Sequence, residues 1–138
     1  MKVITLANLA ESSPQEVFDH IVAHGRRQME KAIQIEGDKE NCVYRTADGK
    51  ACFAGCCMSN DEYALLNQRH NVNSNTPEIV GIEGTTWAHL SREGYVPTAH
   101  VDLIVQMQLI HDGNKTNVWE HRFAEIARTL NLKFDPLY

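Results

Sequence analysis

The segment from residue 41 to residue 63 constrains the fold most, because its composition differs from that of the sequence on either side. It holds all 4 cysteines of the 138-residue chain and an Asp-Gly pair at residues 48–49. The residues around that pair include Val, Tyr, Thr, Cys and Phe, which favour β-strands, and Asp-Gly is typical of a hairpin turn. We therefore expect an antiparallel β-hairpin over residues 42–53. Cys42 and Cys52 would then lie near each other on its two strands.

Helix-start signals and helical periodicity predict helices on both sides of this segment. Ser13 offers a capping hydroxyl and is followed by Pro14 and then by Glu16, a combination that marks a helix start. A capping residue with Glu three positions later recurs at Ser59 and at Asn117. Apolar residues recur at helical spacing after each start. In residues 101–110 they occupy most sides of the helix, which predicts a helix buried between other elements. The helices expected from these patterns cover residues 14–35, 59–70, 98–112 and 117–130.

The remaining segments are short or weakly patterned. Residues 86–91 are expected to form a single helical turn, and residues 71–84, rich in Asn, Ser, Pro and Gly, a long surface loop with an optional short strand at 79–82. No repeat or linker divides the sequence. We expect one globular domain over residues 1–138, with an α+β fold in which four or five helices pack with one small antiparallel β-hairpin.

Composition narrows the classes of function. Hydrophobic residues make up 43% of the chain and charged residues 22%, values typical of a globular domain. No apolar run is long enough to span a membrane, and the first residues lack the pattern of a secretory signal, so a cytoplasmic protein without membrane contact is expected. The net charge of −5 argues against non-specific nucleic-acid binding, which depends on Lys and Arg.

The cysteines suggest a metal site or a buried cluster. In a reducing compartment thiols stay unpaired unless they bind metal or react. Cys42 and Cys52, with Cys56 or Cys57 and a histidine such as His111, are candidate zinc ligands. Their spacing does not match the paired CxxC motifs of structural zinc sites, and buried cysteines often pack as small apolar residues. We expect no cofactor, with zinc as the alternative.

A cysteine nucleophile is a second hypothesis, with Cys52, His111 and Asp112 as candidate catalytic residues. Cys56 and Cys57 precede an expected helix, whose N-terminal amides lower the pKa of a nearby thiol. Neighbouring residues on a helix point about 100° apart, however, so His111 and Asp112 are not expected to hydrogen-bond as base and orienting carboxylate.

Tyr44 and Arg45 form a candidate binding pair on the expected hairpin. Successive strand residues face opposite sides, so one of the two would face the core and the other solvent. The Arg45 guanidinium would suit a phosphate or a carboxylate ligand. The alternative, which we favour, is an ion pair with Asp61 or Glu62 that fixes the hairpin to the next helix.

Several of these segments together resemble a family of small uncharacterised proteins of tailed phages and prophages. The matching pattern is CxYRxxxGxxCxxG followed later by QxxHD. It comprises FDHIVAH (18–24) with Gln28, CVYR (42–45), DGKAC (48–52), Gly55, DEY (61–63), QLIHD (108–112) and Trp119. The Cys56 and Cys57 doublet departs from the small or apolar residue that follows Gly55 in the family, which makes these two cysteines weaker ligand candidates.

The resemblance carries over no catalytic residue, but it implies a biological context. It implies an accessory protein, absent from the virion, that is made during infection and acts in the host cytosol. The leading hypothesis is a protein that binds and modulates a host or defence macromolecule. Two alternatives remain open: a small Cys/His-dependent enzyme or nucleotide-sequestering protein, and a zinc-stabilised interaction module.

Overall fold

The computed structural model describes residues 2–73 and 81–137, and within them the chain folds as α+β, as predicted. Five α-helices accompany one two-stranded antiparallel sheet in these residues. In chain order the elements are η1 (Leu9–Glu11), α1 (Pro14–Gln28), β1 (Ile33–Glu36), β2 (Lys39–Cys42), η2 (Gly55–Cys57), α2 (Asn60–Asn73), α3 (Trp87–Arg92), α4 (Val101–Gly113), η3 (Thr116–Val118) and α5 (Trp119–Thr129).

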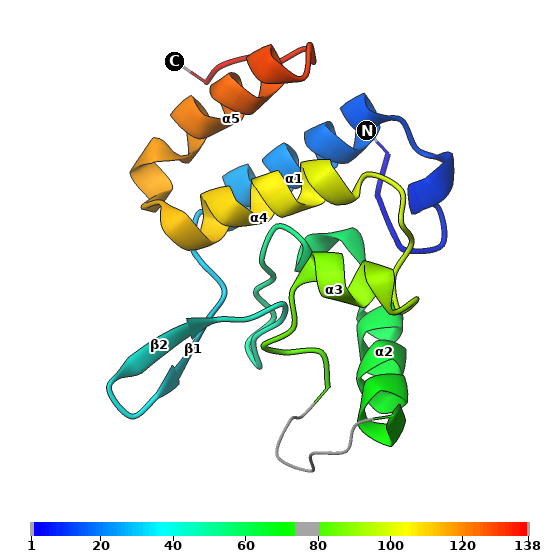
Figure 1. Ribbon diagram of the computed structural model, residues 1–138. Coiled ribbons are helices and arrows are strands. Elements are labelled where there is room, and N and C mark those ends of the chain that lie inside the picture. Colours follow the sequence, from blue (N-terminus) through cyan, green and yellow to red (C-terminus); the bar gives the residue numbers. More distant parts are fainter. Residues whose placement is uncertain (1, 74–80, 138) are drawn as a thin grey trace.

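Helix α4 lies at the centre of the helical packing. It contacts α1, α3 and α5, while α2 lies farther down the molecule and the segment 43–58 passes between these groups (Figure 1). Its buried residues include Leu103, Ile104, Met107 and Ile110. The prediction of a buried helix over 98–112 is therefore confirmed, with a later start at residue 101.

Phe53, from the segment 43–58, fills the core beneath these helices. Its ring centroid lies 4.8 Å from that of Trp119 and 5.7 Å from that of Phe123 on α5. On α1, a Cβ added to Gly25 would lie 3.0 Å from Phe53. Gly25 weakens the middle of the helix as an isolated segment, yet in the fold its missing side chain lets Phe53 approach the helix backbone.

Two of the three expected capping boxes form. The Ser13 hydroxyl accepts from the Glu16 amide, and the Ser59 hydroxyl accepts from the Glu62 amide, each with the reciprocal bond. The box expected at Asn117 is wrong, because η3 leads into α5 and the N-cap has no side-chain bond. Glu120 instead binds the Arg26 guanidinium of α1 at 2.6 and 2.9 Å. Glu120 thus pairs with another helix and does not cap its own.

The hairpin is present, but ten residues earlier than predicted. Helix α1 ends at Gln28 because Met29 takes a left-handed conformation (φ 52°), so the expected helix over 14–35 is wrong in its last turns. Ile33 and Ile35 follow the two-residue period of a strand. They pair with Cys42 and Glu40 across a turn in which Gly37 has φ 64°. Glycine at the first central position is typical of a type II′ hairpin turn.

The predicted hairpin over 42–53 is wrong as a pair of strands. The chain does reverse near Gly49, as expected, and one isolated bridge joins Arg45 to Ala51. Most of the segment 43–58 is nevertheless buried irregular backbone. Its Val, Tyr, Cys and Phe residues therefore reflect burial in the core and not strand pairing.

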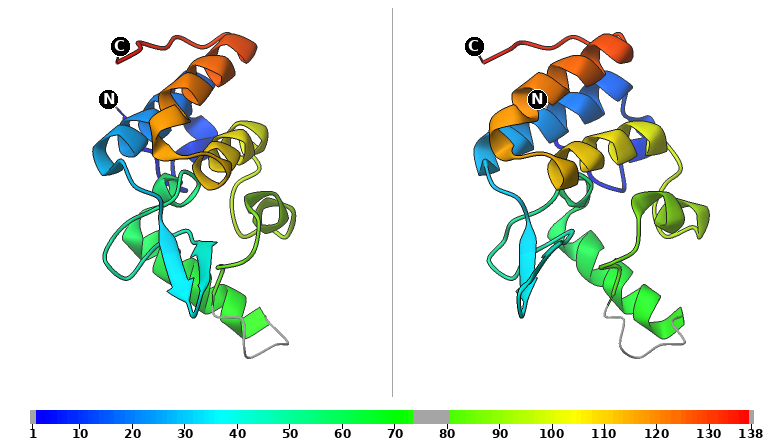
Figure 2. Two further views of the ribbon diagram at one scale, coloured as in Figure 1. Left: turned by 90° about the vertical axis from the view of Figure 1, so that its left-hand side faces the viewer. Right: turned by 60° about the vertical axis from the view of Figure 1, so that its left-hand side comes forward.

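The β1–β2 ribbon projects away from the helices, as two further views show (Figure 2). Every residue of both strands is exposed except Ile33, which is half-buried. The helical turn expected at 86–91 is present as α3, capped by Thr86. Of the strand expected at 79–82, residues 79–80 lie outside the described residues, and residues 81–82 form part of a turn.

The helices of the described residues include none long and apolar enough to cross a membrane.

Candidate functional site

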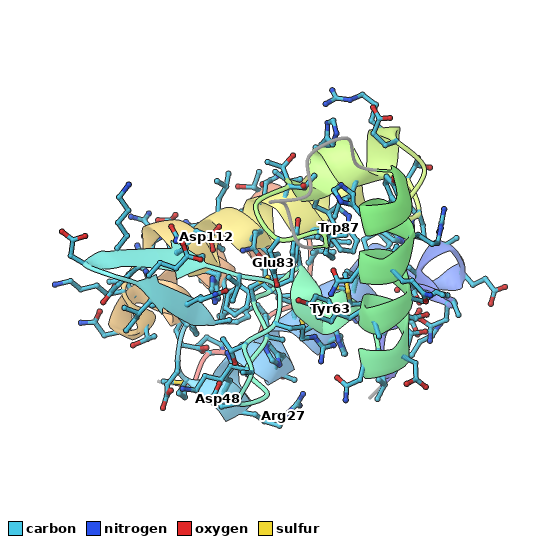
Figure 3. All side chains as sticks on the ribbon, turned by 90° about the horizontal axis from the view of Figure 1, so that it is seen from below. Arg27, Asp48, Tyr63, Glu83, Trp87 and Asp112 are labelled. Carbon is cyan, nitrogen blue, oxygen red and sulfur yellow. The ribbon has the colours of Figure 1, made fainter. Side chains whose placement is uncertain are left out.

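A small cavity of 190 Å³ brings several of the predicted residues together. Cys42 at the end of β2, Tyr44 and Cys52 from the segment 43–58, and Asp112 from α4 all line it. Asp112, Glu83 and Tyr63 follow one another from the ribbon toward α2 (Figure 3). Cys42 and Cys52 thus line one cavity, although the hairpin expected to bring them together does not form.

His111 is fully buried beside this cavity and joins two parts of the chain. Its Nδ1 lies 2.7 Å from Asp112 Oδ1, and its Nε2 lies 3.0 Å from the Ala32 amide nitrogen. The Ala32 N–H is a donor only, so Nε2 carries the lone pair and Nδ1 carries the proton that Asp112 accepts. The expectation that neighbouring His111 and Asp112 would not hydrogen-bond is wrong.

Gln108, one helical turn before His111, completes the arrangement. Its amide donates to Asp112 Oδ1 at 2.7 Å and its carbonyl accepts from the Ala54 amide at 2.8 Å. Residues three and four apart share a helix face, so the QxxHD spacing places all three side chains toward the start of the hairpin and the segment 43–58. This spacing already pointed to a role for Gln108, which was not among the candidate site residues.

The donor set near the cavity does not fit a zinc ion. Ligand atoms of Cys42, His111 and Asp112 lie within 4.8 Å of one another, and Cys52 is outside this group. A metal ion bound to Nδ1 of His111 would use the lone pair of that nitrogen. The proton of the neutral imidazole would then have to sit on Nε2. The Ala32 N–H already points at Nε2, and two donors cannot share that position. Binding zinc would therefore break a buried backbone hydrogen bond.

The thiols of Cys42, Cys52 and Cys56 are poor nucleophiles. Partial burial, with the charge of Asp112, raises the pKa of the Cys42 thiol to about 11. Burial also raises the pKa of Cys52 and Cys56 well above the ordinary value. The expected lowering by a helix N-terminus is thus reversed at Cys56, because loss of hydration dominates. These thiols are protonated near neutral pH.

Asp112 keeps its charge within this group. Burial alone would raise its pKa, but hydrogen bonds from His111, Gln108 and Cys42 outweigh burial and hold the pKa below its usual range. Because Nε2 of His111 is bonded to Ala32, this imidazole has no free lone pair with which to act as a base toward a thiol. The cavity therefore holds a bonded structural network and not an assembled Cys-His-Asp triad.

Tyr44 and Arg45 serve the protein's own backbone. Tyr44 is buried, and its hydroxyl donates to the Thr85 carbonyl at 2.5 Å. Arg45 donates to the carbonyls of Gly55 and Met58 and to the Asn60 side chain. Arg45 thus fixes the segment to the start of α2 as favoured, although its partners are not Asp61 or Glu62.

A larger cleft of 690 Å³ lies between the ribbon and α2. Glu83 is its organising residue: its carboxylate accepts from the amides of Tyr44 (2.7 Å) and Arg45 (3.2 Å) and from the Tyr63 hydroxyl (2.7 Å). Sequence reasoning missed Glu83, because it lies in the segment expected to be a loop and carries no motif. Glu36 and Arg45 also line this cleft, so its lining includes two acidic residues and one arginine.

The chain matches no family model, and no curated protein or solved structure is significantly similar to it.

Proposed function

We propose that this protein acts by binding a macromolecular partner and that the β1–β2 ribbon makes the contact. The exposure of the ribbon carries the proposal: seven of its eight strand residues are exposed. Ordering backbone costs about 1–2 kcal/mol per residue, and an isolated two-stranded ribbon is only marginally stable in water. A partner that covers the ribbon would supply the burial that it lacks.

The resemblance of the CxYRxxxGxxCxxG and QxxHD segments to phage proteins supports the context of this proposal. In that context the partner is a host or defence macromolecule, most simply a host protein, and the protein modulates it in the host cytosol. This assignment is an analogy at the level of the family, since no reaction can be derived from the site itself.

The alternatives find less support in the geometry. A Cys-His enzyme would need a thiolate and a free base, and the cavity offers neither. If Cys52→Ser and His111→Ala both stay folded and keep the full biological effect, that alternative is excluded.

A zinc-stabilised module predicts about one equivalent of zinc by metal analysis and loss of helical circular dichroism on chelation.

A nucleotide-sequestering role has one observation in its favour. The cleft of 690 Å³ lies within the size range of small-molecule sites. Its two carboxylates disfavour phosphate, and Arg45 already binds backbone carbonyls. Isothermal titration with nucleoside triphosphates would show heat of binding only if this alternative holds.

The leading proposal is tested with a variant that lacks the ribbon. The Val43 amide donates to the Ala32 carbonyl at 3.0 Å, so these two residues form a hydrogen-bonded pair that an Asn-Gly turn can close. Replacing residues 33–42 with Asn-Gly should leave the helical fold intact. The matched control is Arg128→Ala on the exposed face of α5.

Tagged wild-type protein should enrich one bacterial macromolecule and form a stoichiometric complex with it once that partner is purified. The variant without the ribbon should lose the complex, and the control should retain it. Failure of the wild type to form a stoichiometric complex with any partner would sink the proposal.

A further inference from the structure

The outer edge of β1 carries free backbone hydrogen-bonding groups. Along an antiparallel ribbon, directly opposite residues alternate between hydrogen-bonded and non-hydrogen-bonded pairs. The bond from the Val43 amide to the Ala32 carbonyl marks the position of these two residues as a hydrogen-bonded one. Gln34 with Asn41 is then a hydrogen-bonded pair. Ile33 and Ile35 therefore direct their N–H and C=O groups away from β2. Among the described residues, none bonds to these groups.

The side chains of the two edges differ. β2 reads Lys39-Glu40-Asn41, and charged residues of this kind protect an edge against pairing with other chains. β1 reads Ile33-Gln34-Ile35-Glu36, with its one charge next to the turn and Ile35 exposed by 69%. The edge of β1 therefore has less protection than that of β2.

A groove of 460 Å³ runs along this edge. Three consecutive residues of β1, from Ile33 to Ile35, line one side, and no residue of β2 takes part. Arg45, Thr46, Ala47 and Asp48 form the rest of the lining, and Asp48 lies on the β1 side of the ribbon (Figure 3). A single extended chain needs about 4.8 Å beside the edge. If a second copy of this protein paired through its own β1, its β2 would also approach the 46–48 turn. The groove therefore favours the addition of a single strand over pairing between two copies.

The face of the ribbon that carries Ile33 and Ile35 continues into charged residues at the base of the ribbon. A hollow of 710 Å³ on this side includes both isoleucines, and its charged lining comprises three lysines (Lys31, Lys50, Lys115) and two glutamates (Glu30, Glu40). Lys50 pairs with Glu30, which leaves two lysines and one glutamate. Lys31 donates a hydrogen bond to the carbonyl of Asp112, and neither Lys31 nor Lys115 has an ion pair with a carboxylate within the described residues. Apolar side chains followed by an acidic one would complement this face.

We infer that the β1 edge binds an extended segment of the partner protein as a third, antiparallel strand. The segment carries apolar residues at alternate positions, opposite Ile35 and Ile33, and then an acidic residue opposite Lys31. Main-chain bonds to the edge provide affinity, and the alternate side chains provide specificity. This inference rests on the proposed function and adds the chemistry of the partner.

The test uses a peptide of sequence TVTVTE with an N-terminal fluorescein and a C-terminal amide. In the antiparallel register its two valines face Ile35 and Ile33, and its glutamate faces Lys31. Fluorescence anisotropy should show saturable binding to the full chain, and hydrogen exchange of the Ile33 and Ile35 amides should slow. The same peptide N-methylated at both valines should bind at least about tenfold more weakly, because the methyl groups remove the donors.

Matched proline variants separate the two edges. Ile35→Pro removes an outward N–H from β1, and Glu40→Pro removes the equivalent outward N–H from its cross-strand neighbour on β2. The first should weaken binding about tenfold and the second should change it by less than about twofold. Ile35→Thr keeps the N–H and should bind more tightly than Ile35→Pro. The peptide TVTVTK should bind more weakly than TVTVTE.

Four results would overturn the inference: no binding of TVTVTE to the wild type, equal binding of the N-methylated peptide, equal effects of the two prolines, or a concentration-dependent dimer by light scattering that Ile35→Pro abolishes. The last result would assign the edge to a second copy. The N-methylated peptide needs no protein variant, so misfolding of Ile35→Pro cannot hide the outcome. If the partner from the ribbon-deletion experiment still binds Ile35→Pro, the edge inference fails while the proposed function stands.

Discussion

The segment 43–58 and the β1–β2 ribbon satisfy their backbones in opposite ways. The ribbon pairs with itself, so it can project into solvent with little help from side chains. The segment 43–58 is irregular and buried, and its amides and carbonyls are bonded by side chains from distant elements. Gln28 binds both the N–H and the C=O of Ala51, and His24 donates to the same carbonyl. Buried irregular backbone needs polar side chains around it.

The two buried histidines also bond to backbone outside the α-helices and strands. His20 accepts from the Ile4 amide and donates to the Cys56 carbonyl. His111 accepts from the Ala32 amide. Residue types that suggested catalysis or metal binding thus hold irregular backbone in place, and in our proposal the exposed ribbon is the element that contacts a partner.

The largest effect is expected from Gly55→Ala. A Cβ at this position would lie 2.2 Å from the Tyr44 carbonyl oxygen, which is backbone and cannot turn aside. The free energy of unfolding should fall by about 3 kcal/mol or more, measured by urea denaturation. Gly113→Ala is the control, since nothing lies near its added Cβ, and an equally large loss there would contradict the explanation.

Gln28→Ala should have the next largest effect. It leaves the buried Ala51 amide without its partner, and an unsatisfied buried donor costs about 2 kcal/mol. Gln34→Ala on the exposed ribbon should change stability by less than about 0.5 kcal/mol. Equal losses in the two glutamine variants, again by urea denaturation, would remove the contrast between the two regions.

Acid should destabilise the buried segment. Burial lowers the pKa of His20 and His24 below 6.5 in the folded protein. The unfolded chain therefore binds protons first, so stability is complete above about pH 6.5 and falls as the pH drops below that value. Urea midpoints between pH 7.5 and pH 5 should decrease, and His20→Gln should flatten this dependence. A midpoint that rises on acidification would contradict the assignment.

The smallest effect is expected on the ribbon itself. Lys39 and Glu36 pair across the strands next to the turn, and both are exposed. Lys39→Ala should change the unfolding free energy by less than about 0.5 kcal/mol, because exposed pairs contribute little. A loss above 1 kcal/mol in thermal or urea denaturation would show that the ribbon is part of the cooperative core.

The sequence by itself determined the α+β class, the helix starts at Ser13 and Ser59, and the buried character of α4. Capping bonds and helical periodicity act over three to four residues, so they can be read without the fold. The QxxHD spacing likewise placed His111 and Gln108 on one helix face.

Only the tertiary structure decided where the strands lie and what the candidate residues do. Apolar β-branched and aromatic residues favour strands and cores alike, so residues 42–53 looked like a hairpin until burial by α1, α4 and α5 was known. The left-handed Met29 ends α1 at Gln28 and leaves Ile33 and Ile35 to form the actual ribbon. His111 acquired its partner Ala32 across 79 residues, and no local pattern encodes a contact at that separation.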